Sequence, residues 1–464
     1  IYAYNLGIVQ GVGDGFAKFI PAAAIGGGGS RDKDGNKNTN INISGGTVYA
    51  QSMGGAAIGG GCSAAAKGGP ANINISGGTI IAKSTTGKYG QEVVSAGVSI
   101  GGGTGKTGGG SVDLNISGEN TILRTGSIGG GKTTGSAKVN ISGGDITGQV
   151  IMAGTGDENN YCEFTMTGGI IHDTDVINGN TIENQYNDPK PDVKIQYLEK
   201  NGGAVWMDDS IGVTNITGGT IEKCTAYRGG AVYMTGGTFT LSENGKIFNN
   251  KVLYSADDKF SGRGGGVYVT GGTANINGGA IDSNAAQVRG GGLYVTGEGE
   301  KKGEVKVSNG SIKKNTAGLN ESRPDVGRGG GVYLEGGDFT MTGGNITDNI
   351  ANYGGGGVYL AKGEGIFTLN GENAIISHNT ATSGGGIYLY VNPYLNQGRI
   401  EGNIAKENGG GMYISDCPVM LEPEKDVFIT GNKAAQNGAG IYIHGSSGSS
   451  GSSGSLNSKV DAVS

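Results

Sequence analysis

Cysteine, proline and tryptophan are scarce in this chain of 464 residues, which has 4 cysteines, 8 prolines and 1 tryptophan. Glycine is abundant, at 100 residues, but without a Gly-X-Y period or many prolines it does not indicate collagen. No segment approaches the ~20 apolar residues that span a bilayer, so no membrane insertion is expected. Apolar residues at helical spacing (i, i+3, i+4) are nearly absent, which excludes a helical fold.

Charge and metal-binding residues are also sparse. The formal net charge is −6, and the lysines and arginines are scattered. Without a basic stripe to neutralise phosphates, nucleic acid is not an expected partner. Gly126 to Thr133 fits the spacing of a phosphate-binding loop, but a strand pattern follows where a helix is needed. The three histidines share no ligand spacing, so neither a metal nor a cofactor is expected.

The feature that is present throughout the second half is a glycine run followed by an aromatic residue between two apolar residues. Nine copies in one register indicate nine copies of one structural unit. In a strand, side chains alternate between faces, so the aromatic residue is expected on the face opposite its apolar neighbours. The nine aromatic residues are Trp206, Tyr233, Tyr268, Tyr294, Tyr333, Tyr359, Tyr388, Tyr413 and Tyr442.

Each copy belongs to a longer repeat of three short segments. The glycine–aromatic segment is followed by a strand such as Thr238–Ser242 and then by Ile-x-x-Asn-x-Ala, as in Ile281–Ala286. Each segment has only two or three inward residues, so a core requires turns stacked ~4.8 Å apart. The sequence therefore predicts an all-β fold: a single right-handed, three-sided parallel β-helix of about fourteen turns.

The corners of this helix are assigned to glycine and asparagine. Gly-Gly pairs reach positive φ at little steric cost, and stacked asparagines can hydrogen bond along a column and tolerate the left-handed region. Cys224 occupies the asparagine position in its repeat and is expected to be buried. Because the cysteines lie several turns apart, beyond the reach of a disulfide, four free thiols are expected.

The chain is divided by these patterns into five parts. Residues 1–20 are a possible N-terminal cap, 21–174 are turns without the aromatic ladder, and 175–201 are a long insertion. Residues 202–444 carry the aromatic ladder, and 445–464 are a Gly/Ser-rich linker and tail. The start at Ile1, without methionine or a leader, suggests a segment of a longer protein.

Two glycine motifs carry a resemblance to a known group. Gly202-Gly-Ala-Val and Gly229-Gly-Ala-Val, each coupled to an x-x-Asn element, resemble the repeats of polymorphic outer-membrane proteins and adhesin-like β-helix proteins of bacterial surfaces. The resemblance extends over residues 20–444, but this chain has isoleucine three residues before asparagine where those repeats favour phenylalanine. It implies a secreted or surface-displayed bacterial protein with a role in adhesion.

The candidate binding surface is the aromatic face with the long insertions expected to overhang it. Aromatic rings stack on the apolar faces of sugars and carboxylates accept hydroxyl hydrogen bonds, so the expected partner is a glycan or a host surface glycoprotein. The candidate ligand-binding residues are Trp206, Tyr233, Tyr268, Tyr294, Tyr333, Asp257 and Asp258. The alternative for the ladder is aromatic packing between strands, which stabilises a sheet by itself.

Two further functions remain open. A glycoside hydrolase needs two carboxylates about 5 to 10 Å apart, for which Asp208 and Asp209 are the candidate catalytic residues. The competing interpretation of this pair is a solvated loop. A passive stalk is the third possibility, and it gains most if the aromatic face is covered.

Overall fold

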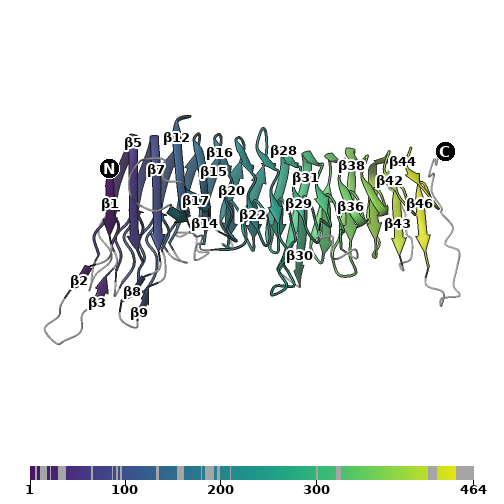
Figure 1. Cartoon of the computed structure of the whole chain (residues 1–464). Coiled ribbons are helices and arrows are strands. Elements are labelled where there is room, and N and C mark those ends of the chain that lie inside the picture. Colours follow the sequence, from purple (N-terminus) through teal and green to yellow (C-terminus); the bar gives the residue numbers. More distant parts are fainter. Residues whose placement is uncertain are drawn as a thin grey trace. The chain divides into compact units, whose positions relative to one another are not determined.

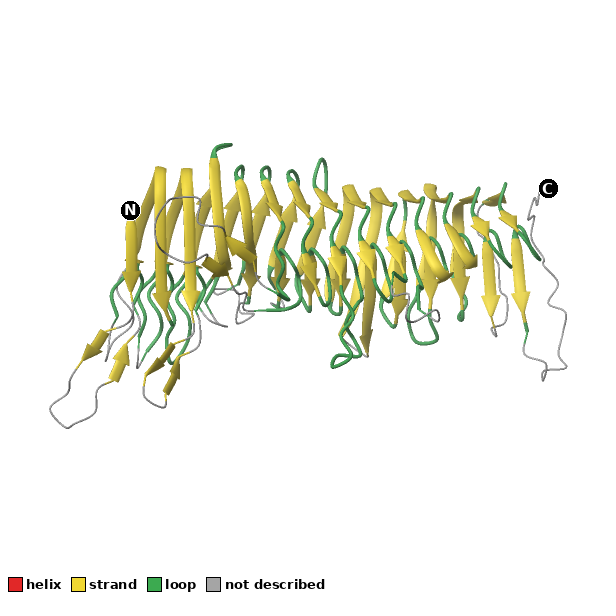
Figure 2. Cartoon of the chain, viewed as in Figure 1, coloured by secondary structure: helices red, strands yellow, loops and turns green. Residues whose placement is uncertain are grey.

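The computed structural model describes residues 1–445, apart from the segments listed at the end of this paragraph. The described residues form strands and loops without a helix (Figure 2). Among them, accordingly, no helix could cross a membrane. The chain divides into two compact units, Ile1–Cys224 and Thr225–Ser464. The segments outside the described residues are 6–7, 11–17, 21, 30–37, 64–65, 86, 90–91, 95–96, 132–134, 154–160, 179, 183–192, 196–198, 209–210, 299–300, 320–325 and 416–425, together with 446–464 at the end of the chain.

Each turn of the second unit contains the three predicted segments, and the third is divided into two short strands at its asparagine. Tyr268 pairs in parallel with Tyr294 one turn further on, and the same register recurs from turn to turn. The tyrosine strands are β23 (Val232–Met234), β27 (Val267–Val269), β30 (Leu293–Glu298), β33 (Val332–Glu335), β37 (Val358–Leu360), β40 (Ile387–Leu389), β43 (Met412–Ser415) and β46 (Ile441–His444).

The second and third segments of each turn form the remaining parallel ladders. Some of them run together as one long strand, which bends at glycines. These strands are β24 (Thr238–Leu241), β25 (Lys246–Phe248), β28 (Gly272–Asp282), β31 (Lys301–Lys313), β34 (Asp338–Met341), β35 (Gly344–Thr347), β38 (Phe367–Ser377), β41 (Tyr394–Glu401) and β44 (Val427–Thr430). The short strands after the asparagines are β22 (Thr225–Ala226), β26 (Lys251–Val252), β29 (Ala285–Ala286), β32 (Thr316–Ala317), β36 (Ile350–Gly354), β39 (Thr380–Ser383), β42 (Ile404–Ala405) and β45 (Lys433–Ala434).

The first unit has the same parallel architecture. Six levels are in register, from Ile25 through Ile58, Ile100, Ile128 and Val150 to Val205. Together with the eight tyrosine levels of the second unit, this confirms the prediction of a parallel β-helix of about fourteen turns. The strands of these ladders are β1 (Tyr2–Asn5), β4 (Ile25–Gly26), β5 (Thr39–Met53), β6 (Ile58–Gly59), β7 (Ala71–Thr85), β10 (Ile100–Gly101), β11 (Val112–Ile116), β12 (Thr121–Gly129), β13 (Ala137–Ile141), β14 (Asp145–Met152), β15 (Glu163–Met166), β16 (Ile170–His172), β19 (Val205–Met207), β20 (Val213–Ile216) and β21 (Thr220–Glu222).

Three antiparallel hairpins interrupt the coil of the first unit. They are β2 (Ile8–Gln10) with β3 (Lys18–Ile20), β8 (Gly87–Tyr89) with β9 (Glu92–Val94), and β17 (Asn180–Ile182) with β18 (Val193–Ile195). The first two project from the same side of this unit (Figure 1).

The core is formed by alternate residues of each strand, as the period of two requires. In the second unit, Phe239, Phe339 and Phe367 are fully buried. The first unit buries isoleucines such as Ile73 and Ile75, while the asparagines between them face outward. Those outward amides form an exposed ladder: Nδ2 of Asn115 donates to Oδ1 of Asn74 at 3.1 Å.

The buried asparagine column of the second unit is continuous from Asn250 to Asn432, as predicted. At each level, Nδ2 and the backbone nitrogen both donate to Oδ1 of the next asparagine, at 2.9 to 3.0 Å. One detail of the prediction was wrong. The left-handed residue is the one before the asparagine, as in Ser283 (φ 58°) and Lys314 (φ 54°), because the amide must point inward to reach its neighbour.

Glycines turn the chain at the start of each tyrosine strand. Gly290, the first of its run, has φ of 63°. The third glycine is required for space: a Cβ on Gly331 would lie 2.7 Å from the carbonyl oxygen of Gly357 and 3.0 Å from Nδ2 of Asn349. The repeated Gly-Gly-Gly therefore combines one conformational and one steric requirement.

Cys62, Cys162 and Cys224 are buried and stand outside any disulfide, as predicted for these three. Cys417 lies outside the described residues. Burial raises the pKa of the Cys224 thiol to about 12. Within the described residues, no group of three or more His, Cys, Asp and Glu side chains is arranged to hold a metal ion.

Candidate functional site

The ladder tyrosines of the second unit form a column, from Tyr233 to Tyr442, in which the rings cover one another's faces. Neighbouring rings from Tyr233 to Tyr442 stack with centroids 4.4 to 5.3 Å apart. Tyr268, Tyr294 and Tyr333 are 6%, 0% and 2% exposed. Their faces are covered by one another, so the prediction that these three rings form open platforms for sugars was wrong. These three rings instead fit the alternative interpretation of the ladder, which is aromatic packing between neighbouring strands.

Burial also governs the chemistry of these rings. It raises the pKa of Tyr268 to about 12, and it raises the pKa values of Tyr333, Tyr359 and Tyr388 as well. The phenols of these four tyrosines therefore resist ionisation in alkaline solution more than an exposed tyrosine does. Tyr233, at the start of the column, is only half-buried.

An exposed aromatic ring is nevertheless present beside the column, on the loop between β26 and β27. Phe260 is 45% exposed. Three cations lie around its ring: Nζ of Lys259 is 4.9 Å from the centroid, and the guanidinium carbons of Arg263 and Arg228 are at 5.1 and 5.7 Å. We call this group the Phe260 platform.

The loop that carries Phe260 is held by hydrogen bonds. The buried hydroxyl of Ser261 accepts from the backbone nitrogen of Ser255 at 2.7 Å and donates to the carbonyl oxygen of Asp258 at 2.6 Å. Asp258 accepts from the backbone nitrogen of Phe260 at 2.9 Å. It also pairs with Arg228 at 2.5 Å. The ring is thus presented by a fixed loop.

The two loop acids have different environments. Asp257 is exposed. Asp258 is half-buried. Burial would raise its pKa, but the Phe260 amide and Arg228 outweigh that effect, and the net pKa is lowered. Asp258 therefore acts as an anionic anchor for the loop.

In the first unit, Asp208 interacts electrostatically with Glu199, a carboxylate that the sequence did not single out. Trp206 is half-buried and pairs in register with Ile151, and Asp208 is exposed. The carboxyl group of Glu199 has a raised pKa, first because it is partly buried and second because of the negative charge of Asp208. Asp209 lies outside the described residues.

The segment with Glu199 is fixed by one buried side chain. Gln149 is fully buried, and its Nε2 donates to the carbonyl oxygens of Glu199, Asn201 and Gly202 at 3.1, 2.9 and 2.8 Å. Gln149 precedes this segment by fifty residues, so no local pattern indicates the contact. The pairing of Glu199 with Asp208 is consequently visible only in the folded chain.

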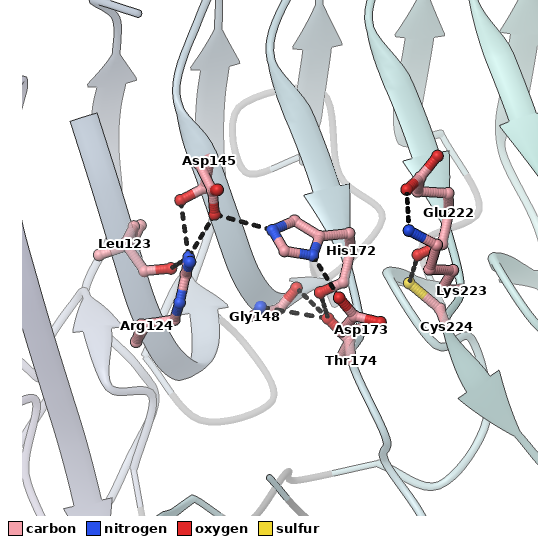
Figure 3. Close-up of polar contacts among 10 residues, drawn as sticks. All are labelled: Leu123, Arg124, Asp145, Gly148, His172, Asp173, Thr174, Glu222, Lys223 and Cys224. Carbon is pink, nitrogen blue, oxygen red and sulfur yellow. Dashed lines mark hydrogen bonds and ion pairs between the residues drawn. The ribbon is translucent and has the colours of Figure 1, made fainter. Parts of the chain in front are cut away.

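A second polar cluster in the first unit joins residues from β12, β14 and β16 (Figure 3). Oδ1 of Asp145 lies 2.5 Å from Nη1 of Arg124 and 2.7 Å from Nε2 of His172. Nδ1 of His172 lies 2.6 Å from Oδ2 of Asp173. Partial burial would raise the pKa of Asp145, but Arg124 and His172 outweigh it and lower the pKa overall. This outer-face cluster links neighbouring turns.

Comparison with known proteins supports the fold and assigns its hand. Residues 325–456 match the family model described as a right-handed β-helix region. No curated protein and no solved structure gave a significant match. The match lies within the second unit and agrees with its parallel ladders, and the chain is a right-handed parallel β-helix.

Proposed function

We propose that this chain is a secreted or surface-displayed bacterial binding module that recognises carbohydrate through the Phe260 platform. The observation that carries the proposal is the exposure of a large aromatic ring on a loop fixed by side-chain hydrogen bonds. Loops on a rigid scaffold are where binding residues are often found, and a preorganised loop loses less entropy when a ligand binds. The adhesion role implied by the resemblance to surface repeats agrees with this proposal.

The Phe260 platform replaces the tyrosine column as the place where a sugar stacks. One face of a sugar ring is apolar and fits against phenylalanine, while its hydroxyls need polar partners at the rim. Asp257 is exposed on the same loop and Lys259 is close to the ring. Both can hydrogen bond to hydroxyl groups.

The test compares two exposed phenylalanines of the second unit. Phe260→Ala removes the platform, whereas Phe428→Ala removes a ring of equal exposure, 46%, from β44. On a broad panel of host and plant oligosaccharides, we expect Phe260→Ala to reduce retention about tenfold or more, the effect of a hot-spot residue. Phe428→Ala should not change it.

Retention of oligosaccharides by Phe260→Ala at the level of the unchanged chain would refute this site. A complete absence of retention would leave the passive stalk as the better account. Thermal unfolding of both variants checks that each is folded.

Glycoside hydrolysis is a second candidate function, favoured by the Glu199–Asp208 pair. A carboxyl group with a raised pKa near a second carboxyl group is the kind of arrangement that acid catalysis at a glycosidic bond uses. If the chain shortens any oligosaccharide, Glu199→Gln and Asp208→Asn should each abolish the shortened product in mass spectra. Phe260→Ala would then retain cleavage, because its loop belongs to the other unit.

A further inference from the structure

Four arginines occupy one corner of successive turns in the second unit. Arg228, Arg263, Arg289 and Arg328 are joined by parallel bridges, each to the next. Each precedes its tyrosine by five residues, directly before the glycine run. We call these residues the arginine column. Their backbone positions recur at the sheet spacing of ~4.8 Å.

The guanidinium groups are held against aromatic rings. The guanidinium carbon of Arg263 lies 5.2 Å from the Tyr294 ring centroid, and that of Arg289 lies 5.1 Å from Tyr333. Arg328 lies 4.6 Å from the ring of Tyr353. Stacking fixes the planar forks while their side chains stay partly accessible, with 11% exposure for Arg263 and 21% for Arg289. Such forks match carboxylate and sulfate groups.

The positive charge of the column is only partly neutralised. Asp258 pairs with Arg228, and Glu335 is shared between Arg263 at 3.3 Å and Arg289 at 3.2 Å. Nε of Arg328 is buried without a hydrogen-bond partner, and within the described part of the chain no carboxylate forms an ion pair with Arg328. Among the described residues, these four arginines thus face two carboxylates, which leaves an excess of two positive charges in this group of side chains.

The column is continuous with the Phe260 platform. Arg228 and Arg263 belong to both groups, because their guanidinium groups also lie over the Phe260 ring. A ligand that stacks on Phe260 and extends along the helix axis therefore meets the arginines in succession. Their repeat is comparable to the length of one pyranose unit, so a sugar chain can present one acidic group per turn.

We infer that the Phe260 platform and the arginine column together bind an acidic polysaccharide, one whose sugar units carry carboxylate or sulfate groups. This inference rests on the proposed function, because it names the class of carbohydrate bound at the same surface. Glu335 already occupies the forks of Arg263 and Arg289, in the middle of the column. Arg328, with no anion of its own, is the expected principal contact.

The experiment uses the full chain and two matched pairs of probes. Oligogalacturonate is compared with its methyl ester, and dextran sulfate with dextran, by titration calorimetry at low and high salt. The charged member of at least one pair should bind about tenfold or more tightly than its neutral partner, and its affinity should fall with salt. Tighter binding of oligogalacturonate than of its ester would indicate carboxylate recognition. Tighter binding of dextran sulfate than of dextran would indicate sulfate recognition.

Three variants locate the binding. Arg328→Gln should weaken binding of the charged probe about tenfold, and Arg328→Lys should restore part of it, because charge returns without the fork. Arg399→Gln removes one positive charge from β41, where Arg399 pairs with Glu401, and should have no effect. Arg289→Gln repeats the test at the neighbouring level, and thermal unfolding shows which variants are folded.

Equal losses in Arg328→Gln and Arg399→Gln would overturn the inference, because they would indicate diffuse electrostatic attraction. Binding of neutral and charged probes with the same affinity would also overturn it, and if Phe260→Ala removed that binding the proposed function would stand. If no probe binds at all, the inference fails, and retention on the oligosaccharide panel decides the proposed function separately.

Discussion

Asn284 and Asn315 are joined by two hydrogen bonds to one oxygen. The backbone nitrogen of Asn284 lies 2.9 Å from Oδ1 of Asn315, and Nδ2 of Asn284 lies 3.0 Å from the same atom. Both residues are completely buried. The Asn315 side chain therefore accepts both hydrogen bonds that Asn284 donates at the corner of the preceding turn. Its own Nδ2 donates in turn to Oδ1 of Asn349, which continues the column.

Asn315→Ala should lower the free energy of unfolding by about 3 kcal/mol, because it leaves several buried polar groups without partners. Urea unfolding measures the loss. Asn437→Ala is the control, since Asn437 forms an analogous bond to Asn408 on the exposed surface, at 2.9 Å. It should change stability by less than ~0.5 kcal/mol. Similar losses for the two variants would contradict a special role for burial.

Tyr294→Ala should cost about 4 kcal/mol of stability, because it removes a fully buried ring from between two stacked neighbours. Tyr294→Phe keeps the ring but loses the hydroxyl contacts with Arg263 and Glu335, and should cost about 1 kcal/mol. Tyr394→Ala, at a ring that is 59% exposed, should be near neutral. Denaturant unfolding would refute this order if Tyr394→Ala proved the most harmful of the three.

The first unit should lose stability in acid through Asp145. Its pKa is lowered in the folded chain, so its contribution is present above the unfolded pKa of about 4 and is lost as pH falls through the folded value. Asp145→Asn should therefore flatten the dependence of Tm on pH below about 4. Asp113→Asn changes an exposed carboxylate of the same unit and should leave the curve unaltered. An unchanged curve for Asp145→Asn would show that the ion pairs do not stabilise the fold.

The native chain should resist thiol alkylation. Cys62, Cys162 and Cys224 are buried, and burial raises the pKa values of Cys62 and Cys224. At pH 8 almost no thiolate is present at Cys224, and thiolate is the reactive form. Peptide mapping after iodoacetamide treatment should find these three unmodified in folded protein and modified in urea. Rapid labelling of Cys224 without denaturant would mean that its turn opens.

The sequence predicts the fold well because each turn repeats the same local requirements. The residue type at each of three positions follows from its local role: Gly290 turns the chain, Ile281 fills the core and Asn284 supplies a buried amide. Repetition of these roles fixes the register between turns. The exposure of the tyrosines could not be predicted in the same way. Turns at sheet spacing bring rings into stacking contact, so Tyr294 is covered by other turns rather than by its own neighbours in sequence.

The candidate sites depend on long-range placement for the same reason. Phe260 stands between two positions already singled out by sequence, Asp258 and Tyr268, but its exposure follows from how the loop closes through Ser261. The partnership of Glu199 with Asp208 depends on Gln149, which is distant in sequence. The arginine column does leave a signal, an arginine before the glycine run in four consecutive repeats, and it becomes informative once the turns are stacked.

The single tryptophan and the tyrosine stack belong to different compact units, which gives the chain two internal optical reporters. Trp206 belongs to the first unit, and the stacked rings from Tyr233 to Tyr442 belong to the second. Fluorescence excited at the red edge of indole absorption follows the first unit, while exciton-like dichroism of closely spaced phenols follows the second. Melting recorded in both channels thus reveals, without any label, whether the two units unfold in one cooperative step or in two.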